Sequence, residues 1–293
     1  MGIDVPLARF TRRIPRFRGW HRLLEPLRRH FVKVYQGRPD RWIVIEDFEG
    51  DLRFRVDRAA YMSSVIYWRG IHSYGEASLI RRFLPSDGVF LDVGANQGEL
   101  TLVAARRAPH GRVIAFEPIP QWFALLSENV RLNGLEHVTL VPVALSSRED
   151  TLEMFTSDDV CLHASFHEGL STFHRTTYRD VPVGRFPTVP LDLYSQREGL
   201  TRVDMIKIDV EGAERAVLEG ARATLDRLRP TLILELNEET FGSAGYSSEA
   251  IAQPLRSMGY TLFHVDPFAR ITPVADRPLA SFGTLLARHE NGL

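Results

Sequence analysis

The sequence predicts an α/β fold in which a mostly parallel β-sheet carries helices on both faces. Short apolar runs that are typical of buried strands alternate with helical segments along most of the chain. The apolar run at residues 89–93 breaks into a turn with two glycines at residues 94–98, as strands do beside a bound ligand. With 293 residues, 44% of them apolar and 25% charged, the composition is that of a globular protein with one large domain or a domain with an appendage.

Residues 1–40 are predicted to form a basic N-terminal extension. They contain ten Lys and Arg residues against Asp4, Glu25 and Asp40, although the whole chain has a net charge of −1. Because the arginines interleave with apolar residues, the segment is suited to peripheral contact with an anionic membrane surface or with an anionic substrate carrier. The favoured interpretation is a solvated extension that packs its apolar side on the main domain.

Residues 41–85 are predicted to form a β-hairpin and a helical lead-in. The alternating segments Trp42–Glu46 and Leu52–Val56 flank a turn rich in Asp and Gly, which is typical of a hairpin. Short helices at Ser63–Arg69 and Ser78–Leu84 then lead into the first strand of the sheet.

Residues 86–293 contain the regular alternation. The predicted strands are 89–93, 112–116, 137–143, 203–209, 231–236, 260–265 and 281–287, and the predicted helices are 98–107, 120–133, 213–227 and 247–258. Because no helix separates the last two strands, we expect an antiparallel pair at one edge.

An insertion at about residues 156–190 interrupts the alternation. It is polar, has little periodicity and is too long for an ordinary connection, which favours a functional lid beside the ligand cleft. Its His163, His167 and His174 are candidates for a general base, as is His264 at the end of a later strand.

Asp92, the turn Gly94–Gly98 and Glu117 are predicted to frame a nucleoside site, because the carboxyl ends of parallel strands bind ligands. A dinucleotide site has the spacing G-x-G-x-x-G, and its middle glycine admits the pyrophosphate. Here the spacing is G-x-x-x-G, and Asn96 stands where that approach would occur. S-adenosylmethionine (SAM) has no pyrophosphate, but its methionine part carries an ammonium group and a carboxylate. Asp92 could contact the ammonium group and Asn96 the carboxylate, so the turn favours SAM over NAD.

Lys207 and Asp209 lie on one face of the predicted strand 203–209, and Asp209 ends it at the ligand edge. Lys207 is one of only two lysines in the chain. Desolvation inside an apolar strand lowers the pKa of a lysine, so Lys207 is a candidate base or hydrogen-bond donor. The alternative is a strand lysine that reaches water or pairs with Asp209.

Asp209, Glu235 and Asn237 are predicted at neighbouring strand ends. Their oxygens are of the type that Mg²⁺ prefers, and they are equally suited to bind substrate hydroxyls, as is Glu211. No spacing rule makes the metal a strong prediction.

The composition excludes several classes of function. The single cysteine, Cys161, rules out an intrachain disulfide framework and favours a reducing compartment, so the cytoplasm is expected. The near-neutral net charge gives no indication of nucleic-acid binding. The sequence has no uncharged run of 18 residues, so no membrane span is expected. The N-terminus lacks the apolar core of a secretory signal.

Several motifs resemble the FkbM family of SAM-dependent methyltransferases, over about residues 50–240. The matching stretches are Leu91–Gly98, Ile114–Pro118, Val143–Ser146, Val189–Asp192 and, most specifically, Ile206–Glu214. One departure is Pro190, which replaces a threonine of the family pattern.

The resemblance implies a Rossmann-like class I methyltransferase fold with a seven-stranded sheet whose last strand is antiparallel, and SAM as cofactor. Asp92, Gly94, Asn96 and Gly98 would hold the methionine part of SAM. Glu117 would hold the ribose, Ala144 would lie near the adenine, and Asp209 would lie between cofactor and substrate.

The expected activity is O-methylation of a hydroxyl on a sugar, glycoconjugate or related natural product. In this hypothesis Asp209 positions the hydroxyl, Lys207 or a histidine of the insertion accepts the proton, and Glu211, Glu235 and Asn237 contact the substrate. Two alternatives are an NAD-dependent oxidoreductase and a non-catalytic SAM-fold binding module.

Overall fold

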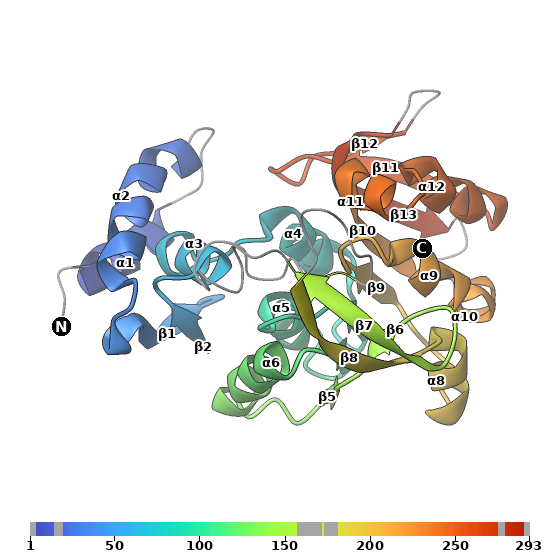
Figure 1. The fold of residues 1–293 in the computed structure, drawn as a ribbon, viewed down its shortest axis with the longest axis horizontal. Helices are drawn as coiled ribbons and strands as arrows, with labels where there is room; N and C mark the ends of the chain where they lie inside the picture. Colours follow the sequence, from blue (N-terminus) through green and yellow to red (C-terminus); the bar gives the residue numbers. More distant parts are fainter. Residues whose placement is uncertain (1–3, 15–19, 157–171, 173–180, 275–278, 290–293) are drawn as a thin grey trace.

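The computed structural model describes residues 4–14, 20–156, 172, 181–274 and 279–289 (Figure 1). Its centre is an eight-stranded sheet of order β12-β11-β13-β10-β9-β3-β4-β5. The strands are β3 (Val89–Val93), β4 (Arg112–Phe116), β5 (Val138–Val141), β9 (Met205–Ile208), β10 (Thr231–Asn237), β11 (Tyr260–Val265), β12 (Ile271–Pro273) and β13 (Phe282–His289). The five strands from β10 to β5 are parallel, so their carboxyl ends lie along one edge.

The antiparallel end of the sheet differs in detail from the expectation. β13 pairs antiparallel with β11 towards one edge, as predicted, and it lies between β10 and β11. An eighth strand, β12, folds back on β11. The Asp266 carboxylate makes this reversal possible, because it accepts hydrogen bonds from the backbone N–H groups of Phe268 and Arg270, and Ala269 adopts a φ of 61°. The expected count of seven strands was therefore one too few.

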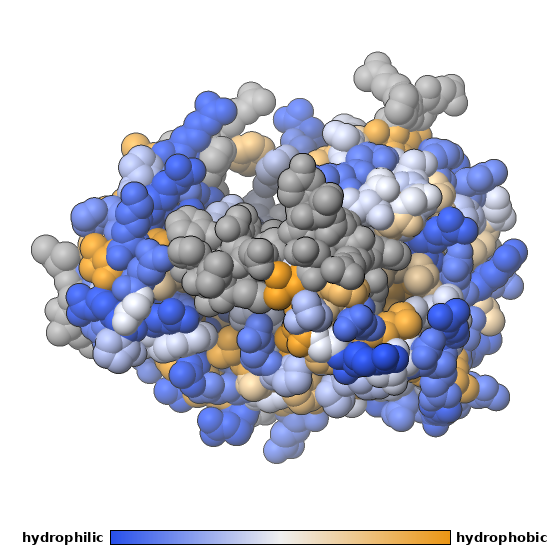
Figure 2. Space-filling view, viewed as in Figure 1, coloured by the Kyte–Doolittle hydropathy of each residue, from blue (hydrophilic) through white to orange (hydrophobic). Residues whose placement is uncertain are grey.

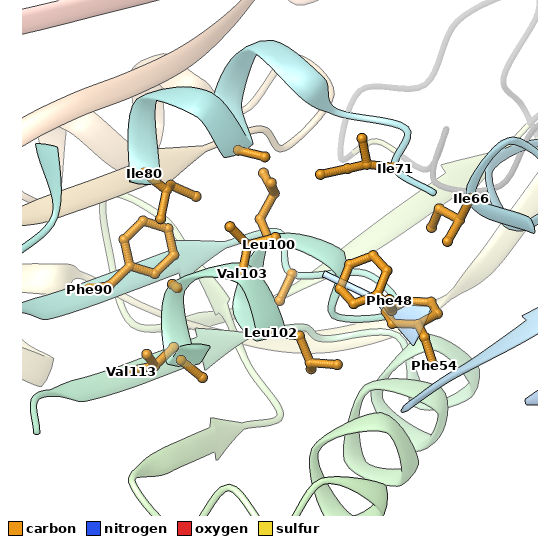
Figure 3. Close-up of a cluster of buried hydrophobic side chains, with 14 of the residues drawn as sticks. Phe48, Phe54, Ile66, Ile71, Ile80, Phe90, Leu100, Leu102, Val103 and Val113 are labelled. Carbon is orange, nitrogen blue, oxygen red and sulfur yellow. The ribbon is translucent and has the colours of Figure 1, made fainter. Parts of the chain in front are cut away.

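Helices cover both faces of the central sheet, as predicted. Because side chains alternate along a strand, Phe90 joins one core cluster and Leu91 joins the other. The first cluster packs under α4 (Tyr74–Phe83), α5 (Glu99–Arg107) and α6 (Pro120–Leu132), and Figure 3 shows part of it. The second packs under α8 (Leu191–Arg197), α9 (Glu214–Glu219), α10 (Arg222–Leu228), α11 (Glu238–Ser243) and α12 (Ser248–Ser257).

The helix predicted at 213–227 is two helices, α9 and α10. The chain bends between them at Gly220, where a Cβ atom would lie 2.0 Å from the backbone oxygen of Ser146. The short helices α8 and α11 were not predicted.

A second, three-stranded sheet of order β6-β8-β7 lies beside the central sheet. It consists of β6 (Ala144–Leu145), β7 (Asp150–Thr156) and β8 (Val181–Val189). The insertion predicted as a lid up to residue 190 is thus partly a strand, because residues 181–189 pair with β7. The rest of it, with Cys161, His163, His167 and His174, lies outside the described residues apart from Thr172.

The N-terminal part lies at the opposite side of the molecule from β11–β13 (Figure 1). It contains α1 (Asp4–Arg13), α2 (Trp20–Tyr35), a 3₁₀ turn (Pro39–Arg41), the hairpin β1 (Trp42–Phe48) and β2 (Leu52–Asp57), and α3 (Tyr61–Arg69). Its helices bury apolar side chains, among them Ala8, Leu24 and Val32. Among the described residues, no helix combines the length and the apolar character needed to cross a membrane.

Asp4 ties the N-terminal helices together. Its buried carboxylate accepts hydrogen bonds from the hydroxyls of Tyr35 and Tyr67 and from the guanidinium of Arg58, all at 2.8 Å. Burial alone raises the pKa of Asp4, but these three donors outweigh it and lower the pKa below its usual value. The three donors come from α2, from α3 and from the end of the hairpin.

Candidate cofactor and acceptor site

A cavity of about 830 Å³ lies at the carboxyl ends of the parallel strands. Its walls come from the turn after β3, the segment after β4, the ends of β9 and β10, the second sheet, and two N-terminal elements, α2 and the start of α3. Volumes of this size suit a cofactor together with a small substrate. The edge at which sequence analysis placed the ligand therefore borders a real cavity.

The turn after β3 requires its glycines. Gly94 has a φ of 78°, and a Cβ atom on it would lie 2.0 Å from the backbone oxygen of Asp209. Gly98 has a φ of 91°, and a Cβ atom there would lie 2.7 Å from the Leu126 side chain. Asn96 adopts a φ of 52°, and its side-chain oxygen accepts a hydrogen bond from the N–H of Gln97 at 2.7 Å. This geometry brings backbone from β3 and β9 into contact at the cavity.

Asp92 lines the cavity from inside the sheet, where its side chain is fully buried. One carboxylate oxygen accepts a hydrogen bond from the Thr101 hydroxyl at 2.6 Å. The other lies 3.5 Å from the ammonium of Lys207 and accepts no hydrogen bond within the described part of the chain. Within the described residues, this second oxygen of Asp92 therefore faces the Lys207 ammonium without accepting a hydrogen bond.

Glu117 is held at the end of β4 by two backbone donors. Its carboxylate accepts hydrogen bonds from the N–H of Asn96 at 2.9 Å and from the N–H of Ile119 at 2.8 Å. Burial nevertheless raises the pKa of Glu117 to about 7. A carboxylate so placed can accept hydrogen bonds from the hydroxyls of a ribose.

Beside Glu117, an apolar part of the cavity is formed by Ile119, Trp122, Leu145 and Met154, together with Ala144 on β6. Ala144 is where the resemblance places the adenine. A flat apolar base suits this lining.

Lys207 does not have the lowered pKa expected from its sequence. Burial alone lowers the pKa of the lysine, but the carboxylates of Asp209 and Asp92 outweigh it and raise the pKa to about 12. The ammonium donates to the backbone oxygen of Gly94 at 2.7 Å and lies 3.6 Å from Asp209 Oδ2. Lys207 is therefore a charged residue on β9 that binds the end of β3. The expectation of a neutral lysine base is wrong.

Asp209, Glu211 and Glu235 gather at the strand ends, with one carboxylate oxygen of each within 4.8 Å of the others. The charge of Asp209, together with burial, raises the pKa of Glu235 to about 11. Glu235 thus holds a proton beside the Asp209 carboxylate, which is the state that two close carboxyl groups adopt when they share a site.

Asn237 does not join this group as a free ligand. Its side-chain oxygen caps α11, accepting from the N–H groups of Glu239 at 3.1 Å and Thr240 at 3.4 Å. The predicted Mg²⁺ set of Asp209, Glu235 and Asn237 therefore does not fit, because the Asn237 oxygen is committed to the cap; the carboxyl groups that converge are those of Asp209, Glu211 and Glu235.

His72 is a site residue that sequence reasoning missed. It lines the cavity from the connection between α3 and α4, and its Nδ1 lies 3.2 Å from Ser73 Oγ. The Glu99 carboxylate, at the start of α5, accepts hydrogen bonds from the backbone N–H groups of His72 and Ser73. Burial lowers the pKa of His72, against the opposing charges of Glu76 and Asp209.

In the sequence, His72 was marked only by its place between two predicted helices. Its contact with α5 is a tertiary feature. His264, the candidate on β11, is not among the residues that line the cavity within the described chain.

The fold and this cavity define a class of protein. A parallel sheet with an antiparallel end, a glycine turn after β3 and an acid at the end of β4 are the features of a Rossmann-like class I methyltransferase. The match to a family model is more specific: residues 92–262 match the methyltransferase FkbM domain. Because the match covers more than half of the chain, the chain belongs to this family.

Three relatives illustrate the similarity. Methyltransferase sdnD of Sordaria araneosa is 32% identical over 159 residues, which are 47% of this chain and 61% of that protein. The 31-O-demethyl-FK506 methyltransferase FkbM of Streptomyces tacrolimicus is 30% identical over 203 residues, 61% of this chain and 74% of that protein. The 2-O-methyltransferase NoeI of Sinorhizobium fredii is 29% identical over 153 residues, 49% of this chain and 61% of that protein.

The chain thus spans about 61% of the length of both sdnD and NoeI. Among solved structures, the methyltransferase FkbM from Methylobacillus flagellatus aligns with a TM-score of 0.44 at 12% identity, over 92% of this chain and 60% of that chain.

Proposed function

We propose that this protein is a SAM-dependent O-methyltransferase that acts on a hydroxyl of a sugar, glycoconjugate or related natural product. The observation that carries the proposal is the cavity in which Glu117, the glycine turn and the acids after β9 and β10 meet. The family match supports methyl transfer, and the printed names of NoeI and FkbM support oxygen as the acceptor atom.

The residues at the cofactor end fit SAM. Asp92 and Asn96 suit the charged methionine part, Glu117 suits the ribose, and the slot at Ala144 suits the adenine. Gly94 and Gly98 let the turn pack closely against Asp209 and Leu126, since a side chain on either glycine would clash. When bound, SAM supplies a methyl group on a sulfonium, which is the electrophile of the reaction.

Asp209 is suited to orient the acceptor hydroxyl. It lies at the cavity edge with its side chain 39% exposed, whereas Lys207 behind it is buried and charged. Glu235 holds a proton, so it can donate to Asp209 and fix its direction. In-line alignment of the reacting atoms is the main contribution that a protein makes to such a displacement.

We propose that His72 is the base that accepts the proton of the acceptor hydroxyl. The ring is neutral near pH 7 because burial lowers its pKa, and Ser73 occupies Nδ1, which leaves Nε2 for the cavity. The acceptor hydroxyl would give its proton to Nε2 as the methyl group passes from the sulfur of SAM to the hydroxyl oxygen, which leaves the sulfur as a neutral thioether, and Asp209 and Glu76 would stabilise the resulting imidazolium. His163 and His167 stay predictions, because they lie outside the described residues.

Calorimetric titration with SAM and with NAD, followed by incubation with radiolabelled SAM and fractionated extract from the source, tests the proposal. We expect SAM to bind and label to pass into a small molecule or glycan. EDTA should leave the rate unchanged, and Asp209→Asn should lower turnover at least tenfold at saturating SAM.

NAD binding without SAM binding would support the oxidoreductase. SAM binding without transfer to any fraction would support the non-catalytic module. Near-wild-type turnover of Asp209→Asn would remove Asp209 from its role.

A further inference from the structure

We infer that the methyl acceptor carries an acidic group, a carboxylate or a phosphate, which binds to Arg29 and Lys33 on α2. This inference rests on the proposed function and names the acceptor class for the same cavity. The wall formed by α2 is far from the cofactor turn in sequence, and the family match, which begins at residue 92, does not include it.

The first observation is that α2 forms a wall of the cavity. Five of its residues line the same space as Asp209 and Glu117: Glu25, Arg28, Arg29, Val32 and Lys33. Arg29 and Lys33 are four residues apart, so they lie on one face of the helix, one turn from each other. Both side chains are exposed, Arg29 to 70%, so neither is buried by the protein itself.

The second observation is an excess of positive charge on this wall. The Glu25 carboxylate is shared by Arg28 at 2.6 Å, Arg29 at 2.8 Å and Arg69 at 2.8 Å. Burial opposes ionisation of Glu25, but its arginine partners lower its pKa to about 2. One negative charge thus faces three arginines, and Lys33 adds a fourth cation. The net charge of this cluster is three positive.

The third observation is the opposite charge at the other end of the cavity. Asp209 and Glu211 lie at the strand ends, where the hydroxyl must be placed, and Glu235 beside them is protonated and adds no charge. An acidic group next to them is repelled, whereas the same group is attracted by α2. The two ends therefore select one orientation, with the hydroxyl at the sheet and the acid at the helix. The space-filling view shows predominantly hydrophilic side chains over α1 and α2 (Figure 2).

A lipid surface is the competing partner for basic residues on α2. The position of Arg29 and Lys33 on the wall of an 830 Å³ cavity favours a small acid over a flat surface. Binding of Arg29 and Lys33 to lipid is therefore an outcome that the test must distinguish.

The test follows the charge of the labelled product. Full-length protein is incubated with radiolabelled SAM and source extract, and the product is passed over an anion-exchange resin. We expect the label to be retained by the resin and eluted by salt. If the acidic group is a phosphate, treating the product with phosphatase before chromatography should abolish retention of the label. If the group is a carboxylate, the label should still be retained.

Arg29→Gln/Lys33→Gln should lower labelling of the acidic product by 10- to 100-fold at limiting extract, with a smaller loss at saturation, because charged hydrogen bonds that hold the acceptor are removed. SAM affinity, measured by calorimetry, should be unchanged. Arg22→Gln is the matched control, since Arg22 is exposed on α2 but is not among the residues lining the cavity.

Label in the unretained fraction, or wild-type labelling by the double variant, would overturn the inference while leaving O-methylation intact. Loss of sedimentation with phosphatidylserine vesicles in the double variant, with labelling of the acidic product unchanged, would assign these residues to lipid and also overturn it. Absence of both SAM binding and labelled product would overturn the proposed function itself.

Discussion

At the scale of single residues, the site depends on charges that the protein buries in contact with one another. Lys207 stays protonated because Asp92 and Asp209 flank it, and the negative charge of Asp209 keeps the proton on Glu235. A charge that is buried without a partner is strongly unfavourable, so each of these groups depends on its neighbours. The consequence is a cavity edge whose protonation pattern is set before any ligand binds.

Glu117 should make cofactor affinity depend on pH. Its pKa of about 7 means that the carboxylate that we propose to bind ribose hydroxyls is lost as the pH falls below 7. We expect SAM affinity, measured by calorimetry, to fall by up to tenfold per pH unit between pH 7 and 5.5. Glu117→Gln should bind SAM at least tenfold more weakly at pH 8 and lose most of this dependence.

Glu214→Gln is the control for that experiment. Glu214 also has a pKa of about 7 and is buried, but it binds the backbone N–H groups of Val210 and Gly212 and is not among the residues lining the cavity. An unchanged pH profile in Glu117→Gln would contradict the role of Glu117.

The folded pKa of Glu117 lies above its ordinary 4.5, so ionising it opposes folding, and the free protein should gain stability from this group as the pH falls from 7 towards 4.5.

His72→Gln should lower turnover by 10²- to 10³-fold near pH 7, because the proton acceptor is removed. The wild-type rate should decline only at acidic pH, where His72 becomes charged, whereas the rate of the variant should rise steadily with pH. Turnover under saturating SAM and acceptor is the measurement, and SAM affinity should be unchanged. His264→Gln is the matched control, and wild-type turnover in His72→Gln would place the base elsewhere.

At the scale of elements, α1 and α2 depend on a buried contact with the rest of the N-terminal part. Asp4 on α1 binds Tyr35 on α2, Tyr67 on α3 and Arg58 after the hairpin. Since α2 lines the cavity, this carboxylate helps to fix the position of its cations, together with the contacts of Arg28 with Ser64 and of Glu25 with Arg69 on α3.

Asp4→Ala should therefore lower the free energy of unfolding by about 3 kcal/mol, the usual effect of removing one partner of a buried ion pair. We expect faster hydrogen exchange in residues 20–35 and weaker acceptor binding with unchanged SAM affinity. Asp40→Ala, which removes the partner of Arg38 in an exposed pair, should leave the urea midpoint unchanged. Equal effects of the two variants would show that the Asp4 contact does not hold α2.

At the scale of the whole molecule, the cavity is a junction of distant segments. The cofactor end is built from residues 92–145, the acidic edge from residues 207–237, and the cationic wall from residues 25–33. Two apolar clusters, one on each face of the sheet, hold the strand ends in register behind it. In the proposed function, cofactor and acceptor are thus bound by parts of the chain that are distant in sequence and meet at one cavity.

Local sequence determined much of this protein. The parallel strands and most helices follow from apolar periodicity. Asp92, Gly94, Asn96, Glu117 and Asp209 line the cavity because the direction of a strand dictates where its carboxyl end lies, whereas Gly98 belongs to the same turn but is not among the lining residues. These features depend on residues that are neighbours along the chain.

Only the tertiary structure decided the remainder. The pKa of Lys207 rises instead of falling because Asp92 from the neighbouring strand β3 joins Asp209 from the end of its own strand β9, and Asn237 is committed to capping α11. His72 and the cations of α2 reach the cavity through packing across long sequence separations. Electrostatics and proximity depend on which segments meet in space, and the order of residues along one segment does not contain that information.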